Sequence, residues 1–160
     1  MHSTPSWRDD VAPGDIISFV YPSKEDDPCL ERPRPCLVLE VDRSGPEPEI
    51  LVAYGTSALS RANTGYEVRV MQAASMRDAG LHRPTRFVAA RRLRVALSSP
   101  RIIPCAQGTA RIGRLSEDLR PRLERVLSLL ATEIASRSSV RSRRARHLRH
   151  GPRASAEVKC

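Results

Sequence analysis

The feature that most constrains the fold is a pair of apolar, β-branched runs separated by a loop rich in glycine and proline. The first run spans residues 34–41 and the second spans residues 50–57, and the residues between them include Gly45, Pro46 and Pro48. Two such runs joined by a turn-rich loop predict a β-hairpin. A hairpin cannot bury its apolar side chains alone, so further strands or a helix must cover it.

The free ends of this hairpin carry polar side chains. Arg34 opens the first run, and the hydroxyls of Thr56 and Ser57 close the second. In an antiparallel pair the start of one strand lies beside the end of the other. We therefore expect the guanidinium and the two hydroxyls to lie at the same end of the hairpin.

Other short runs predict additional strands, and aromatic residues make up only 4% of the chain, so the core should be aliphatic. β-branched and alternating patterns favour extended structure. These runs are residues 16–21, 66–70, 85–90 and 93–97. Residues 72–80 are expected to form a short helix or turn that ends at Gly80.

From Ser116 onward the apolar period changes from two residues to three and four, which is typical of one helix face. Ser116 is a candidate N-cap, and because Pro121 fits poorly inside a regular turn, the helix should begin near Arg120. The apolar face comprises Leu119, Leu123, Val126, Leu127, Leu130 and Ile134. Strands followed by one helix predict a mainly β fold, a small barrel or half-barrel with a C-terminal α-helix.

The chain is expected to divide into a flexible N-terminus (1–12), one barrel domain with its helix (13–136) and a disordered tail (137–160). The formal net charge is +9, but residues 137–153 hold seven arginines and no acid, which leaves only +2 for residues 1–136. The basicity therefore belongs mainly to the tail. Its arginine- and serine-rich composition favours disorder.

The four cysteines, Cys29, Cys36, Cys105 and Cys160, show neither a CxxC pattern nor a Cys/His pairing. We expect free thiols in a reducing cytoplasm, with no metal site and no disulfide framework. The first residues lack the apolar stretch of a signal peptide. No apolar run approaches the roughly 20 residues that span a membrane, so no membrane association is expected.

An ordered set of motifs resembles the PemK/MazF family, the ribosome-independent messenger-RNA endonuclease toxins of bacterial toxin–antitoxin pairs. The resemblance covers about residues 13 to 134. The matching segments are Pro13-Gly14-Asp15-Ile16-Ile17, Arg34-Pro35-Cys36-Leu37-Val38-Leu39, Ile50-Leu51-Val52-Ala53-Tyr54-Gly55-Thr56-Ser57, Gly80-Leu81 with Pro84-Thr85-Arg86-Phe87, and Ile112-Gly113-Arg114-Leu115. Three departures are Arg32 in place of a frequent glycine, a long acidic first loop, and the basic tail.

The resemblance implies an SH3-like barrel with a C-terminal helix, a homodimer, and a cognate antitoxin whose disordered segment folds across the dimer groove. It also implies cleavage of single-stranded RNA without a metal or other cofactor. It assigns Arg34 as the main catalytic cation and Thr56 as its hydroxyl partner. Ser57 and Arg86 would help to bind the substrate.

Each candidate residue has a plainer interpretation. Arg34 would then be a surface residue at a strand start, paired with Glu31, and Thr56 with Ser57 would form a strand-end turn, where hydroxyls are favoured. Arg86 would be a buried structural arginine. His82 is a further candidate for substrate binding or for acid–base work, since imidazole titrates near neutral pH; the alternative is a solvated loop histidine.

Two rival functions keep the same barrel without RNA cleavage. One is a non-catalytic module that binds nucleic acid or is itself an antitoxin-like interaction module, and the other binds a protein target in the manner of gyrase-poisoning toxins. The acidic loop 25–31 is either solvated or a gate over the groove. The tail is either a plain charged segment or an electrostatic RNA holder, in which case RNA binding would depend strongly on salt.

Overall fold

The computed structural model describes residues 6–22, 32–58 and 60–149. It separates into two units, residues 1–127 and residues 128–160. The first unit contains every strand that the structure describes, and the second contains the continuation of the C-terminal helix. The acidic loop 25–31 lies outside the described residues.

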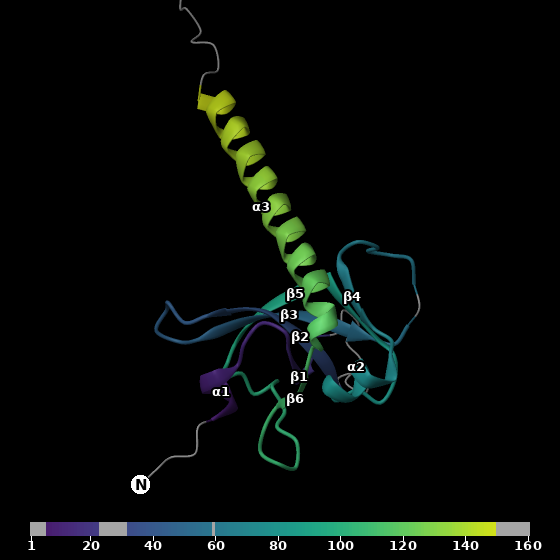
Figure 1. Ribbon diagram of the computed structural model, residues 1–160. Helices are drawn as coiled ribbons and strands as arrows, with labels where there is room; N and C mark the ends of the chain where they lie inside the picture. Colours follow the sequence, from purple (N-terminus) through teal and green to yellow (C-terminus); the bar gives the residue numbers. More distant parts are fainter. Residues whose placement is uncertain (1–5, 23–31, 59, 150–160) are drawn as a thin grey trace, which may run out of the picture. The chain divides into compact units, whose positions relative to one another are not determined.

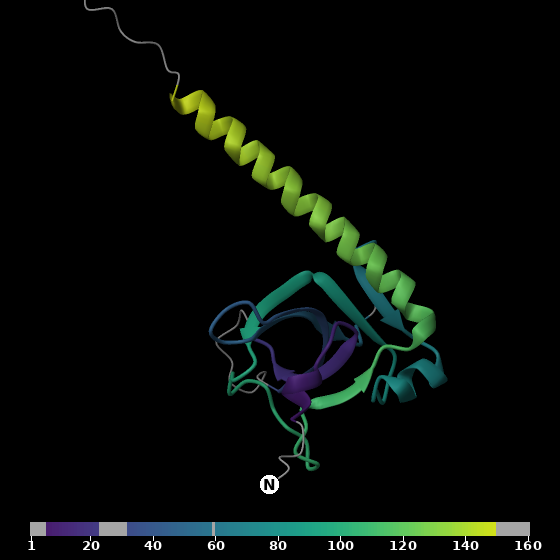
Figure 2. The ribbon, with the colours of Figure 1, turned by 60° about the vertical axis from the view of Figure 1, so that its left-hand side comes forward.

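The first unit is built on one curled antiparallel sheet (Figures 1 and 2). Its strand order is β4-β5-β3-β2-β1-β6. The elements are α1 (Trp7–Asp10), β1 (Asp15–Val20), β2 (Pro33–Asp42), β3 (Glu49–Thr56), β4 (Glu67–Val70), α2 (Ala73–Asp78), β5 (Thr85–Ala96), β6 (Arg111–Arg114), a 3₁₀ turn (Glu117–Leu119) and α3 (Arg120–Arg149). The expected mainly β half-barrel with a C-terminal helix is confirmed at this level.

The interior of the curl is filled by small and medium aliphatic side chains, as the low aromatic content predicts. Phe19 on β1 is the one large ring that is fully buried in this cluster, and Trp7 of α1 packs against the same group. The cluster consists of Trp7, Val11, Ile17, Phe19, Cys36, Val38, Ile50, Val52, Val95, Leu97, Ile102 and Ala110. Burial of these groups supplies the main driving force for folding the unit.

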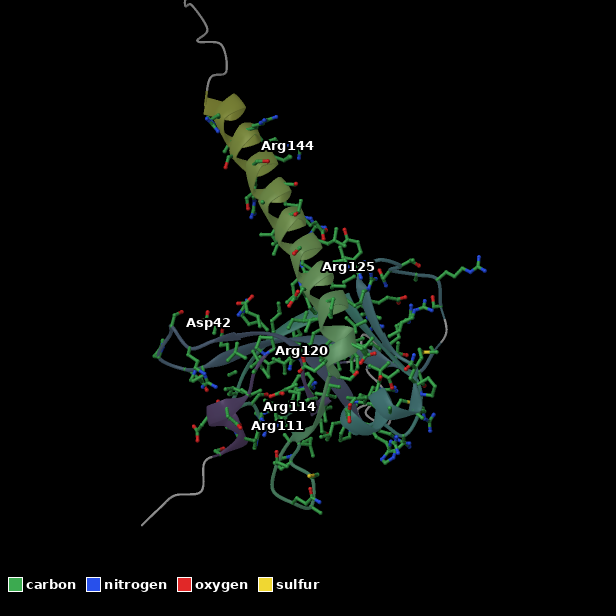
Figure 3. All side chains as sticks on the ribbon, viewed as in Figure 1. Asp42, Arg111, Arg114, Arg120, Arg125 and Arg144 are labelled. Carbon is green, nitrogen blue, oxygen red and sulfur yellow. The ribbon has the colours of Figure 1, made fainter. Side chains whose placement is uncertain are left out.

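The predicted hairpin is confirmed: β2 pairs with β3 in antiparallel register, with Cys36 opposite Tyr54. Its turn is shaped by Asp42, whose carboxylate accepts hydrogen bonds from the backbone N–H and the hydroxyl of Ser44 (Figure 3). These hydrogen bonds stabilise the carboxylate and hold the pKa of Asp42 below its usual value. The local side-chain bonds thus fix the turn.

The two runs expected at residues 85–90 and 93–97 form a single strand, β5, interrupted by a bulge. Tyr54 is paired with Val88, and the preceding residue of β3, Ala53, is paired with Arg92. Residues 89–91 therefore have no partner on β3. The prediction of two short strands was wrong, because a bulge interrupts the alternation of apolar and polar residues without ending the strand.

Strand β6 falls outside every expected strand. Its arginines Arg111 and Arg114 lie beside the buried carboxylate of Asp15 on β1, with nitrogen–oxygen distances of 3.4 and 3.1 Å (Figure 3). Asp10 also pairs with Arg111, at 3.1 Å. These carboxylates raise the pKa of Arg111 above its ordinary value, despite the opposing effect of burial. The strand is held by charges from distant parts of the sequence, which no local pattern reveals.

The expectation of a flexible segment over residues 1–12 is wrong for its described part, residues 6–12. Ser6 and Asp9 form a reciprocal capping box that starts α1. Trp7 and Val11 are buried in the core. The apolar burial and the cap together order a segment whose composition is polar.

Helix α3 begins at Arg120, as Pro121 predicts, because proline is tolerated where no intrahelical N–H bond is needed. Ser116 precedes the 3₁₀ turn but its side chain makes no capping hydrogen bond, so the predicted side-chain cap is wrong. Within the first unit, Leu123 and Val126 of the expected apolar face are buried.

The predicted disorder of the tail disagrees with the structure for residues 137–149, which continue α3. No glycine or proline occurs between Pro121 and Gly151, and arginine and alanine are good helix formers. Arg137 also pairs with Glu133 one turn earlier. The side chains of Ile134 and Val140 are exposed, at 54% and 57%.

Candidate functional site

A cleft of about 600 Å³ lies where β2 begins and β3 ends. The loop between α2 and β5 forms another wall. Its described lining residues are Ser18, Arg32, Pro33, Arg34, Pro35, Gly55, Thr56, Ser57, Gly80, Leu81, His82, Arg83, Thr85 and Ile112. Four of the five candidate residues from the sequence, Arg34, Thr56, Ser57 and His82, therefore line one cleft.

The hairpin register explains why Arg34 and Thr56 meet. The paired register ends with Cys36 opposite Tyr54, and counting two residues further along each strand brings Arg34 level with Thr56. The backbones approach closely here, since a Cβ at Gly55 would lie 2.1 Å from the carbonyl oxygen of Pro35. A glycine between Tyr54 and Thr56 is thus required for the strands to close on this end of the cleft.

Arg34 is exposed, and its Cζ lies 5.9 Å from the centre of the Tyr54 ring. Among the described residues, no carboxylate lies within ion-pair distance of its guanidinium. The pairing with Glu31 that the plainer interpretation requires falls outside the described residues. The planar guanidinium thus lines the cleft with a fork of N–H donors suited to two oxygens of one phosphate.

Thr56 is half-buried, and its Oγ1 accepts a hydrogen bond of 3.1 Å from the backbone N–H of Ala58. This is the strand-end turn of the plainer interpretation. The contact uses an oxygen lone pair and leaves the hydroxyl proton to donate, because a hydroxyl is both acceptor and donor. Ser57 is exposed beside it. The turn and a phosphate-orienting role are therefore compatible.

His82 and Arg83 lie in the loop that follows α2, and a close backbone contact with β6 places this loop. Gly80 has a φ of +66°, and a Cβ there would lie 2.0 Å from the carbonyl oxygen of Ile112. A Cβ on Gly113 would likewise lie 2.2 Å from the carbonyl carbon of Ala79. Two glycines thus allow α2 to pack on β6 at the edge of the cleft.

Replacing Gly80 by alanine should therefore destabilise the fold by more than φ strain alone, which costs about 1–2 kcal/mol. Gly108 is the matched control, because it has a φ of +76° and nothing within 4 Å of a Cβ placed on it. Urea denaturation of both variants measures the difference. Equal losses of stability in the two variants would show that the contact with Ile112 does not constrain the loop.

Arg86 does not line this cleft. Its side chain is buried and pairs with Glu67 at 2.9 Å, and it donates to the carbonyl oxygens of Ser60 and Ala62 at 2.8 and 3.0 Å. These contacts match the alternative of a buried structural arginine. Arg86 anchors the segment after β3 and so supports the wall that carries Ser57.

Arg32 and Arg83 line the cleft but were not among the candidates drawn from the sequence. Each lies within two residues of a candidate, Arg34 or His82, and that proximity was the available signal. Among the described lining residues there are three arginines and no aspartate or glutamate. The cleft is therefore cationic and suits an anionic ligand such as a phosphodiester.

Cys36 lies next to the site but is sealed from it. Burial, outweighing the backbone N–H of Gly55 and the charge of Arg34, raises the pKa of its thiol to about 12 from an ordinary 9.0. At pH 8, iodoacetamide should modify the exposed Cys105 in the folded protein and spare Cys36. Peptide mass spectrometry measures this, with urea-unfolded protein as the control.

The same shift sets a pH dependence. The folded state keeps a proton on Cys36 that the unfolded chain releases above about pH 9. Protonated Cys36 therefore makes its full contribution to the free energy of unfolding below pH 9, and this contribution declines as the pH rises toward 12. In the labelling experiment at pH 8, modification of Cys36 in the folded protein as fast as Cys105 would contradict both the burial of the Cys36 thiol and its raised pKa.

Comparison of the sequence with known protein families finds no match, and comparison with curated proteins finds none either. Within the described ranges there is no group of three or more His, Cys, Asp or Glu side chains that could hold a metal ion. None of the helices described is both long and apolar enough to cross a bilayer.

Proposed function

We propose that this protein is a metal-independent endoribonuclease of the PemK/MazF type that cuts single-stranded RNA. The observation that carries the proposal is that Arg34 and Thr56 of the hairpin and His82 of the later loop line one cationic cleft. The ordered motifs support the family assignment. On the same basis the protein would be the toxin of a toxin–antitoxin pair, acting as a homodimer in the cytoplasm and bound by a cognate antitoxin.

The chemistry is an attack of the ribose 2′-oxygen on the adjacent phosphorus. The new P–O2′ bond forms as the P–O5′ bond breaks, giving a 2′,3′-cyclic phosphate and a 5′-hydroxyl. Arg34 binds two phosphoryl oxygens and offsets the charge that develops on them. Thr56 donates to the same phosphate.

The proton balance of this step needs both a group that accepts the 2′-proton and a group, or the same group acting in turn, that supplies a proton to the leaving 5′-oxygen. Imidazole does either near neutral pH, which gives His82 a role in the cleft. Arginine remains protonated throughout the accessible range, so Arg34 acts through its fixed charge and donors.

A DNA oligonucleotide tests this mechanism directly, because it lacks the 2′-hydroxyl at every position. We expect the protein to cut an RNA of about 30 nucleotides and to leave the DNA of the same sequence intact, as gel electrophoresis of end-labelled strands would show. Cutting of both strands would overturn attack by the 2′-oxygen.

A second candidate function is a non-catalytic module that binds nucleic acid or a protein on the same barrel, including a gyrase-poison-like action. The absence of Asp and Glu among the described lining residues favours it, because carboxylates are common general bases. Tight binding of RNA without any cleavage would select this alternative.

A further inference from the structure

An aromatic and cationic cluster lies beside the cleft, and apart from Arg34 its residues have no part in the mechanism above. We call it the Tyr54 platform; it comprises Tyr21, Tyr54, Arg34 and Arg91. The rings of Tyr21 and Tyr54 meet edge to face with their centres 5.1 Å apart. The guanidinium carbon of Arg91 lies 4.4 Å from the centre of the Tyr54 ring, and that of Arg34 lies 5.9 Å from it.

The bulge in β5 presents Arg91 to this ring. Residues 89–91 have no partner on β3, and their backbone is tied down elsewhere. The hydroxyl of Tyr21 donates to the carbonyl oxygen of Arg91 at 3.0 Å, and the N–H of Ala89 donates to the carbonyl oxygen of Tyr66 at 2.8 Å. Bulges commonly re-aim a side chain next to a functional site.

Arg91 is exposed, and no carboxylate of the described part of the chain lies within ion-pair distance of it. An arginine resting on an aromatic face is held in place while the edge of its guanidinium still offers N–H donors. A cation in this arrangement is ordered before a ligand arrives. Such pre-organisation lowers the entropic cost of binding.

We propose that Arg91, held by Tyr54, is a second phosphate-binding subsite for the single-stranded RNA whose scissile phosphate lies at Arg34. This inference rests on the proposed function. Arg34 belongs to both sites, because it lines the cleft and lies over the Tyr54 ring. The two guanidinium carbons are separated by at most the sum of their distances to that ring. One strand can therefore contact both.

The subsite binds and positions RNA and does not touch the reacting atoms. Its loss should raise KM and leave kcat nearly unchanged, the pattern expected when an interaction is equally strong in the ground and transition states. Loss of Arg34 should instead lower kcat. The two arginines over one ring are thus separable by kinetics.

The binding experiment uses a fluorescein-labelled 2′-O-methyl RNA, which lacks the attacking hydroxyl and is not cut. Fluorescence anisotropy over a series of salt concentrations gives the slope of log Kobs against log salt concentration. We expect Arg91→Gln to weaken binding about fivefold, as for an exposed ion pair. The slope should decrease in magnitude by about 0.7, the value for one phosphate contact on a single strand.

Arg94→Gln is the matched control. Arg94 lies on the same strand three residues away, is exposed, and pairs with Glu40 at 3.2 Å. The substitution removes the same charge, and we expect little change of slope. An Arg91→Gln slope that changes no more than the Arg94→Gln slope would overturn the subsite.

Tyr54→Leu tests the platform without changing charge. We expect weaker binding with a nearly unchanged slope, and Tyr54→Phe should restore the affinity because it keeps the ring. Circular dichroism melting confirms that each variant is folded. Equal affinities of Tyr54→Leu and the wild type would overturn the role of the ring.

These results are distinguishable from a failure of the proposed function. If the wild type binds the 2′-O-methyl strand through Arg91 but never cuts RNA, the nuclease proposal fails and the phosphate subsite stands. If RNA is cut while Arg91→Gln leaves both KM and the salt slope unchanged, the nuclease stands and the subsite fails.

Discussion

Replacing Arg34 by alanine should lower the rate of RNA cleavage by about 10²–10³-fold, the usual cost of removing one pre-organised donor from a developing oxyanion. The guanidinium lines the same cleft as Thr56 and has no carboxylate partner among the described residues. A phosphate bound in the cleft would lie within reach of its donors. Initial rates on an end-labelled RNA, at substrate concentrations above KM, measure the loss.

Two further variants separate geometry from charge. Arg34→Lys keeps the charge but loses the two-pronged fork, so it should recover only part of the activity. Arg94→Ala removes one exposed arginine outside the cleft and should leave the rate nearly unchanged. A rate for Arg34→Ala equal to that of Arg94→Ala would remove Arg34 from the chemistry.

Replacing Glu67 by glutamine should destabilise the fold by about 3–5 kcal/mol, the cost of breaking one buried ion pair by removing one partner. The side chains of Glu67 and Arg86 are only 4% and 8% exposed, and their closest atoms are 2.9 Å apart. The variant leaves the Arg86 cation buried without a counter-charge. The Nε of Arg86 already has no hydrogen-bond partner in the described structure.

Thermal unfolding followed by circular dichroism measures this effect, and a fall in Tm of roughly 10–20 °C is expected for a unit of this size. Glu40→Gln is the control, because Glu40 and Arg94 form an exposed pair that should contribute at most about 1 kcal/mol. A shift for Glu67→Gln no larger than that control would contradict a structural role for the buried pair.

The part of the site that lies on the hairpin follows from the sequence alone. Two β-branched runs and one turn fix an antiparallel pair, and counting along the register brings Arg34 to Thr56. These are local relationships within 24 residues. Pattern and turn chemistry therefore determine this half of the cleft.

The other half depends on contacts between distant segments. His82 lines the cleft because Gly80 and Gly113 allow the backbone at the end of α2 to approach the backbone of β6 closely. A glycine in a sequence does not show which segment its backbone will contact. Strand β6 pairs with β1, and the contacts of Arg111 and Arg114 with Asp15 add charge interactions to that pairing. The family resemblance implied a substrate role for Arg86, and the sequence did not show its buried partner, Glu67, because the two lie 19 residues apart.

The central claim is tested most directly by incubating the purified wild-type protein with a long single-stranded RNA in EDTA and identifying the ends of the products. The proposed function predicts fragments that carry 5′-hydroxyl ends and 2′,3′-cyclic phosphates, because the 2′-oxygen displaces the 5′-oxygen without help from a metal. An intact RNA, or fragments with 5′-phosphate ends, would contradict it.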